Sequence, residues 1–186
     1  NLIEGSLSKN LEIIKQKTGN SSDIVIRHLK IGHNFQIKIA LLYIKGMVDN
    51  QSVKDFVIDS IMNNQNLSEK LIPLDVLEAL TVDVIAVGEI KVVSDWTKLL
   101  SALMSGETII LIDGVSKGVC ASTQGGQRRS VQESTTDVSI RGSKEAFNES
   151  IETNTAMVRR IINNTDLWVE SIHIGKITKT EVSIMY

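Results

Sequence analysis

The sequence contains little cysteine, proline or aromatic residue, and no long hydrophobic run. Of its 186 residues, one is cysteine, one is proline and 4% are aromatic. The single thiol, Cys120, excludes an intrachain disulfide and a multi-cysteine zinc site. The longest apolar stretch, residues 37–48, is interrupted by Lys38, Lys45 and Gly46, so it falls short of the roughly 18 apolar residues of a membrane span. We therefore expect a water-soluble segment.

Neither sign of charge dominates. The formal net charge of −2 argues against a dedicated nucleic-acid-binding protein, which would carry a strongly basic domain. Hydrophobic residues make up 42% and charged residues 23% of the chain, which indicates a packed globular protein. The chain begins with Asn1 and ends in a strand-like run, residues 180–186. We expect it to be a fragment of a longer protein.

Hydrophobic periodicity predicts a mixed α/β fold. Helices are expected at residues 8–17, 50–64, 74–80, 96–104 and 144–162. Strands are expected at residues 23–30, 36–43, 108–112, 115–121, 137–140, 167–174 and 179–186, and residues 84–93, interrupted at Gly88-Glu89, are expected to form one strand or two short ones. The pair Asp113-Gly114 predicts a tight primed hairpin turn with two positive φ angles.

A polar, glycine-rich segment at residues 123–136 divides these elements and predicts a linker. We expect two small subdomains, residues 1–122 and 137–186, each a mixed sheet with packed helices. Residues 23–43 align without gaps on residues 166–186, with four identities in 21 pairs. Either an ancestral duplication or two unrelated helix–hairpin units would account for this similarity.

The sequence offers little for catalysis. It contains no H-E-x-x-H, G-x-S-x-G or Walker motif, and its three histidines have no carboxylate at a metal-ligand spacing on a helix. Cys120, within a predicted strand, is expected to be a small buried thiol. The pair Glu145 and Glu149 suits a solvated helix face better than general acid–base catalysis. We expect no catalytic residue, no metal and no cofactor.

The segment between residues 133 and 162 has the most distinctive pattern. Gly142 permits a sharp entry into a helix capped by Ser143, and the order of acidic and then basic residues along it complements the helix dipole. An apolar stripe is expected at Phe147, Ile151, Val158 and Ile161. Asn154 falls within this stripe, so its amide either bonds to a neighbouring backbone or faces a cleft or a partner.

This segment resembles the signature of the A subunits of bacterial spore germinant receptors, the GerA family. The run Arg141-Gly-Ser-Lys-Glu-Ala-Phe-Asn-Glu149, followed by Asn154 and Arg159-Arg160, is similar to the family pattern R-G-P-x-E-G-F-x-E, an asparagine and a basic cluster. Upstream, Glu133-Ser134-x-x-Asp137 is similar to E-x-P-x-x-E. The departures are serine for proline at Ser134 and Ser143, alanine for glycine at Ala146, and Asp137 for glutamate.

The resemblance implies the cytosolic N-terminal domain of a subunit whose multi-pass domain lies in the spore inner membrane. It implies B and C subunits as partners, and a role in nutrient sensing, signal relay and receptor assembly, without enzymatic activity. The family pattern implies ligand or partner contacts for Arg141, Gly142, Glu145, Phe147, Glu149, Asn154, Arg159 and Arg160. The alternative is a module that binds an amino acid or a sugar in the cleft between the two subdomains.

Overall fold

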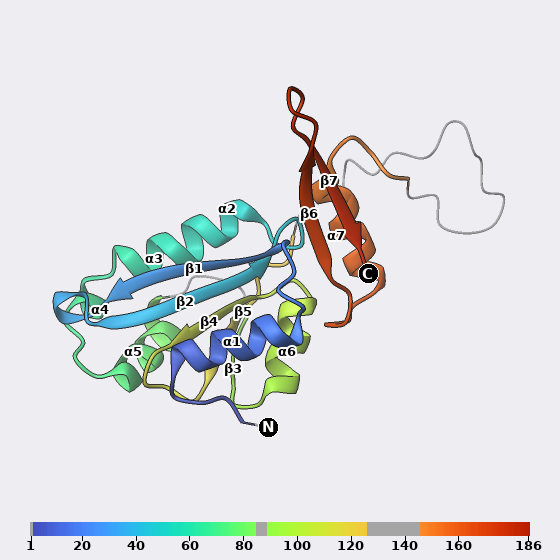
Figure 1. Ribbon diagram of the computed structural model, residues 1–186. Helices are drawn as coiled ribbons and strands as arrows, with labels where there is room; N and C mark the ends of the chain where they lie inside the picture. Colours follow the sequence, from blue (N-terminus) through green and yellow to red (C-terminus); the bar gives the residue numbers. More distant parts are fainter. Residues whose placement is uncertain (1, 85–88, 126–145) are drawn as a thin grey trace.

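The computed structural model describes residues 2–84, 89–125 and 146–186, and it contains two β-sheets (Figure 1). The larger sheet has five strands in the order β1-β2-β4-β5-β3, and the smaller pairs β6 with β7. All neighbouring strands run antiparallel. The strands are β1 (Ile24–Ile31), β2 (Ile37–Ile44), β3 (Ile90–Val93), β4 (Thr108–Ile112), β5 (Gly118–Ala121), β6 (Val169–Ile174) and β7 (Thr180–Met185). The expected mixed α/β fold class is confirmed.

The central strands β2 and β4 are covered on both faces, which explains their continuous apolar sequences. One face, with Ile39 and Ile110, packs against residues of the segment 53–80. The other face, with Leu42 and Ile109, packs against helices α1 (Leu7–Lys17) and α6 (Trp96–Met104). The five-stranded sheet is therefore the middle layer of a three-layer unit (Figure 1).

The helical segment expected at residues 50–64 is present, but it is not a uniform α-helix. It comprises α2 (Asn50–Ser52), a π-helical stretch (Val53–Ile58) and α3 (Asp59–Met62). Two shorter helices follow, α4 (Gln65–Ser68) and α5 (Pro73–Ala79), and a further π-helical turn spans Leu80–Val84. Pro73 occupies the first turn of α5, where its missing N–H costs no hydrogen bond. Among the described helices, none combines the length and the apolar character needed to cross a bilayer.

Two predictions for the larger sheet differ from the structure in detail. Of the one strand or two short strands expected at residues 84–93, β3 accounts for residues 90–93, Val84 belongs to the π-helical turn that continues α5, and residues 85–88 lie outside the described residues. The turn after β4 is also not a primed turn, since only Gly114 has a positive φ, of 87°. Val115 N donates to Ile112 O at 3.2 Å, and β4 and β5 resume pairing only at Leu111 and Gly118.

The helix expected at residues 144–162 is shorter, because α7 spans Ile151–Ile161. Ser150 caps it by accepting a hydrogen bond from Thr153 N at 3.2 Å. The expected cap at Ser143 and the strand at residues 137–140 lie outside the described residues. The predicted apolar stripe is wrong, since Phe147 and Ile161 are 69% and 71% exposed. The buried face of α7 instead consists of Thr153, Thr155, Ala156, Met157 and Arg159.

The hairpins β1–β2 and β6–β7 share one register under the alignment of residues 23–43 with 166–186. Two cross-strand pairs of the first hairpin are Ile26↔Leu42 and Ile31↔Ile37. Their aligned counterparts in the second hairpin are the observed pairs Val169↔Met185 and Ile174↔Thr180. A helix precedes each hairpin. Duplication stays a hypothesis, because two unrelated hairpins can have the same pairing register.

Candidate functional site

The unit formed by α7, β6 and β7 is joined to the larger sheet by a buried arginine. Arg159, on α7, is 1% exposed. Its Nε donates to Asp23 Oδ2 at 2.8 Å and its Nη2 donates to Asp23 Oδ1 at 3.1 Å. This two-point pairing uses the planar guanidinium to satisfy both carboxylate oxygens. Asp23 immediately precedes β1, so the pair connects segments separated by 136 residues of sequence.

Ser21 extends this ion pair into a network. Its Oγ accepts hydrogen bonds from Arg159 Nη2 at 2.9 Å and from Val169 N at 2.7 Å, and it donates to Asp23 Oδ1 at 2.7 Å. Ser22 N donates to Val169 O at 2.8 Å, which ties β6 to the residues before β1. In the described part of the chain, every buried side-chain nitrogen and oxygen has a hydrogen-bond partner. The desolvated charges are thus fully paired, as burial requires. We call Ser21, Asp23, Arg159 and Val169 the polar junction.

Two glycines, Gly46 and Gly19, allow the C-terminal unit to pack closely against the N-terminal part of the chain. Gly46 has a φ of 73°, and a Cβ there would lie 2.9 Å from Ala156 Cβ and from Glu152 O of α7. Gly19 has a φ of 58°, and a Cβ there would overlap the Trp168 indole. Both positions combine a left-handed backbone with contact against the C-terminal unit, so glycine is required at each.

A cleft of about 590 Å³ lies beside the junction, between the segment after β2 and α7. Its charged groups are Asp49, Glu152 and Arg160. Arg160 Nη2 donates to Gly46 O at 2.8 Å and to Gly125 O at 3.2 Å, which fixes one wall. The Asp49 carboxylate accepts hydrogen bonds from the Ser52 hydroxyl and from Ser52 N, and these bonds lower the pKa of Asp49. The cleft therefore presents both signs of charge.

The predicted site residues fall into three groups. Arg141, Gly142 and Glu145 lie outside the described residues. Phe147 and Glu149 are exposed and precede α7 instead of lying on it. The remaining residues, Asn154, Arg159 and Arg160, lie on α7.

The Asn154 side chain bonds to a neighbouring backbone, which was one of its two expected roles. Its Nδ2 donates to Asn148 O at 2.7 Å and its Oδ1 accepts from Asn148 N at 2.9 Å. These two bonds close the loop before α7. They also explain the late start of the helix, because the backbone of Asn148 is held by a side chain and not by a helical turn.

The sequence analysis missed Ser21, Asp23 and Glu152. Asp23 begins a strand, where an acidic residue is ordinarily solvated, and its partner is remote in sequence. The only available signal was Asp23 as one of four identities shared with residues 166–186, and this signal says nothing about Arg159. Glu152 reaches the cleft because α7 packs against Gly46.

Cys120 is a buried thiol, as expected. Burial, supported by the negative charge of Glu107, raises the pKa of Cys120 to about 12. Such a thiol is a poor nucleophile because its thiolate is scarce at neutral pH. Over residues 2–84, 89–125 and 146–186, no three His, Cys, Asp or Glu residues gather as metal ligands would.

These observations define a class of protein: an α/β domain in which a small second sheet is joined to a five-stranded sheet through a buried arginine. A profile of the Bacillus/Clostridium GerA spore germination proteins matches residues 12–186, and the chain belongs to this family. The resemblance inferred from the motif is therefore confirmed.

The sequence similarity to known relatives covers nearly the whole chain. Spore germination protein KA of Bacillus subtilis (strain 168) is 39% identical over 185 residues, and the uncharacterized membrane protein YfkQ of the same strain is 31% identical over 184 residues. The crystal structure of the N-terminal domain of the A subunit of the Bacillus megaterium spore germinant receptor GerK3 matches all of this chain and 66% of its own, with 42% identity and a TM-score of 0.75. The chain spans about a third of the two curated relatives, 33% and 34% of their lengths.

Proposed function

We propose that this chain is the N-terminal domain of the A subunit of a nutrient germinant receptor. It would contribute to germinant sensing, to signal relay and to receptor assembly with B and C subunits. The observation that carries the proposal is the match of the whole chain to the N-terminal domain of a germinant receptor A subunit. The full-length protein would lie in the spore inner membrane, with this domain on the spore-core side.

The domain would act by position and contact, without catalysis. The C-terminal unit is held by charge-assisted hydrogen bonds at Arg159, and α7 lies in close contact with Gly46. A displacement of that unit would therefore be transmitted to the start of β1 and the end of β2. The division into subdomains at residues 1–122, 123–136 and 137–186 stays a prediction that fits this mechanism. Thr123 and Gly125, at the start of the expected linker, pack against Thr108 and Asp49.

The residues of the family motif would have two roles: some stabilise the position of the C-terminal unit, and others form a surface for a partner subunit. Arg159 and Arg160 attach the C-terminal unit to the N-terminal part of the chain, and Asn154 closes the loop before α7. The exposure of Phe147 and Glu149 supports a surface for a partner subunit. Arg141, Gly142 and Glu145 lie outside the described residues and stay predicted contact residues of the motif.

Germination of spores that carry full-length variants tests this assignment. Phe147→Ala combined with Glu149→Gln should impair nutrient-triggered germination while the receptor level stays normal. The control is Glu12→Gln on α1, which is also exposed and removes the same charge. Arg141→Ala and Glu145→Gln extend the test to the rest of the motif. Unchanged germination in all motif variants would refute the proposal, and loss of the receptor protein would assign the motif a structural role only.

The alternative function is the binding of an amino acid or a sugar in the cleft beside the polar junction. The presence of Asp49, Glu152 and Arg160 in one cleft favours it, because a zwitterion needs both signs of charge. Titration of the 186-residue chain with amino acids and sugars should shift the NMR signals of the Gly46 and Gly125 amides. Glu152→Ala should weaken such binding. No shift at millimolar ligand would eliminate this alternative and leave the receptor assignment intact.

A further inference from the structure

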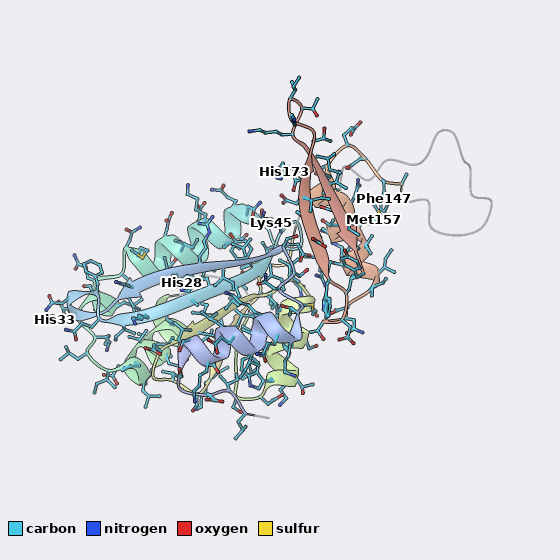
Figure 2. All side chains as sticks on the ribbon, in the orientation of Figure 1. His28, His33, Lys45, Phe147, Met157 and His173 are labelled. Atoms are coloured by element: carbon cyan, nitrogen blue, oxygen red, sulfur yellow. The ribbon has the colours of Figure 1, made fainter. Side chains whose placement is uncertain are left out.

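A second cavity, of about 490 Å³, lies between the edge strand β1, its neighbour β2 and the helical segment that begins at Asn50. Its sheet side is formed by Val25, Arg27, Tyr43 and Lys45. Val25 pairs with Tyr43, and Lys45 N continues the ladder by donating to Asp23 O at 2.9 Å. Because side chains alternate along a strand, the four residues project from one face of the sheet. We call this space the sheet-edge cavity, and Lys45 marks it in Figure 2, at the end of the sheet that approaches the C-terminal unit.

Tyr43 places a hydroxyl without a partner in the sheet-edge cavity. The residue is 5% exposed, and it packs in an apolar cluster with Val48, Val53 and Val25. In the described part of the chain, the Tyr43 hydroxyl makes no hydrogen bond, yet no fully buried side-chain oxygen lacks a partner. The hydroxyl therefore reaches the open space of the cavity that Tyr43 lines. A polar group at the end of a buried side chain is normally hydrogen-bonded, so this one is left to water or to a ligand.

Three cationic side chains, those of Arg27, Lys45 and Lys54, line the same cavity. Arg27 and Lys45 lie on either side of the pair formed by Val25 and Tyr43, and Lys54 borders the cavity from the helical segment. Within the described residues, no carboxylate lies within ion-pair distance of any of the three. A hollow lined mainly by one sign of charge concentrates ions of the other sign.

Carboxylates offset only part of this positive charge. Among the described residues, Glu152 is the single carboxylate that lines the sheet-edge cavity, which leaves a formal excess of two positive charges. Lys45 also borders a smaller cavity with Glu152 and Glu181, so Arg27 and Lys54 contribute most of the excess. The other carboxylates of this region bond to residues of the chain: Asp23 to Arg159, Asp49 to Ser52 and Asp55 to Gln51.

We propose that the sheet-edge cavity binds a small organic dianion, with Arg27, Lys45 and Lys54 neutralising its charge and the Tyr43 hydroxyl donating a hydrogen bond to it. The planar guanidinium of Arg27 suits two-point contact with a carboxylate or a phosphate group. The apolar part of the lining, Val25, Val53 and Ile58, would contact a short carbon frame. A dicarboxylate and a phosphate monoester share this chemistry. Cations that converge on one hollow favour a small ligand over a nucleic acid or a membrane, which would need an extended basic face.

NMR titration of the 186-residue chain with succinate and with glycerol phosphate tests the proposal. At least one of the two dianions should shift the amide signals of Lys45 and Lys54 in a saturable way at millimolar concentration. Neutral succinamide, and sodium chloride at equal ionic strength, should not. Tighter binding of succinate would assign the site to dicarboxylates, and tighter binding of glycerol phosphate to phosphate monoesters. No saturable shift with either dianion would overturn the proposal and leave the receptor assignment intact.

The contribution of charge is tested with Arg27→Gln combined with Lys54→Gln. This double variant should raise the dissociation constant of the dianion at least about tenfold, because it removes two charge-assisted contacts. The matched control is Lys15→Gln with Lys176→Gln, which removes the same charge at two exposed positions outside the cavity. It should change the dissociation constant by less than about twofold, since distant exposed charges are screened. Equal losses for the two double variants would overturn the site in favour of a general charge effect.

The contribution of the tyrosine is tested with Tyr43→Phe, which keeps the ring and removes the hydroxyl. The dissociation constant should rise about fivefold, as expected for one lost hydrogen bond. The urea midpoint of the ligand-free chain should stay unchanged, because the hydroxyl has no partner in the described part of the chain. Tyr186→Phe is the control, since Tyr186 is 63% exposed and its hydroxyl donates to Glu170 at 2.8 Å. Unchanged affinity in Tyr43→Phe would overturn the assignment of this hydroxyl to the ligand.

Discussion

At the scale of the residue, Arg159 is the largest of the fully buried side chains in the described part of the chain. A basic residue in the last turn of a helix usually stabilises the dipole from the surface. Arg159 is instead buried, because α7 turns that side chain toward Asp23 and Ser21. Arg160, its neighbour in sequence, bonds to backbone oxygens at the rim of the cleft. The two arginines are equivalent in the sequence pattern and differ completely in burial.

Arg159→Ala should lower the free energy of unfolding by about 3–5 kcal/mol, because it leaves the Asp23 carboxylate buried without its partner. Urea denaturation measures the change. Arg160→Ala, as the control, should cost much less because it leaves no buried charge behind. In the double variant Asp23→Ala with Arg159→Ala, the cost should be well below the sum of the two single changes. Additive losses would contradict the coupling.

Cys120 should resist thiol reagents in the native protein. With a pKa raised to about 12, the thiol stays protonated near neutral pH, and it is buried as well. Ellman's reagent should react slowly until urea is added, whereas Ser116→Cys, in the exposed β4–β5 turn, should react at once. Because the folded pKa lies above the ordinary value of 9.0, this group stabilises the fold below pH 9 and the stabilisation is lost as the pH rises toward 12. Equal native rates for both thiols would contradict this prediction.

At the scale of the element, capping decided where the helices begin. Asp49, Asn64, Asp95 and Ser150 each accept a backbone hydrogen bond from the first turn of their helix. The start of α6 was predictable from its aspartate and the apolar run behind it. The start of α7 was not, because the segment offers several serines and the bonds between Asn154 and Asn148 select Ser150.

Asp49→Ala should cost about 1 kcal/mol of stability through loss of the cap on α2. Asp49→Asn should cost less near neutral pH, because an amide oxygen still accepts the bond. The folded pKa of Asp49 lies below its ordinary value of 3.8, so its charge stabilises the fold above pH 3.8 and this contribution is lost as the pH falls through the folded value. Denaturation curves from pH 7 down to acid should therefore converge for wild type and Asp49→Asn. A constant gap would contradict this.

The hairpin β6–β7 should be the least stable sheet element of the isolated chain. Val169 is the single buried residue of the two strands, and two strands alone are marginally stable. Amide hydrogen exchange should be fastest in β6 and β7 and slowest in β2 and β4, which are covered on both faces. Protection in β6 equal to that of β2 would show that the polar junction stabilises the hairpin more than its burial indicates.

At the scale of the whole molecule, two units of different character are joined. The three-layer unit is held by apolar packing on both faces of its sheet. The C-terminal unit is attached through the polar junction and two glycine contacts, and it adds one α7 residue, Ala156, to the apolar cluster on the α1 and α6 side. Polar attachments of this kind tolerate rearrangement better than apolar cores, because their bonds can be exchanged for bonds to water. This contrast fits the proposed relay of a signal by displacement of the C-terminal unit.

The sequence by itself determined the fold class, the approximate positions of most local elements and, through the motif between Arg141 and Arg160, the family. These properties depend on hydrophobic periodicity, turn residues and short motifs, all of which involve residues close together in the sequence. The tertiary structure alone decided that Arg159 is buried against Asp23, that Phe147 is exposed, and that a cleft opens beside Glu152. The partners in the junction are 136 residues apart, and a single sequence carries no measure of distance between them. The packing of α7 against Gly46 and the bonds of Val169 to Ser21 and Ser22 bring them together.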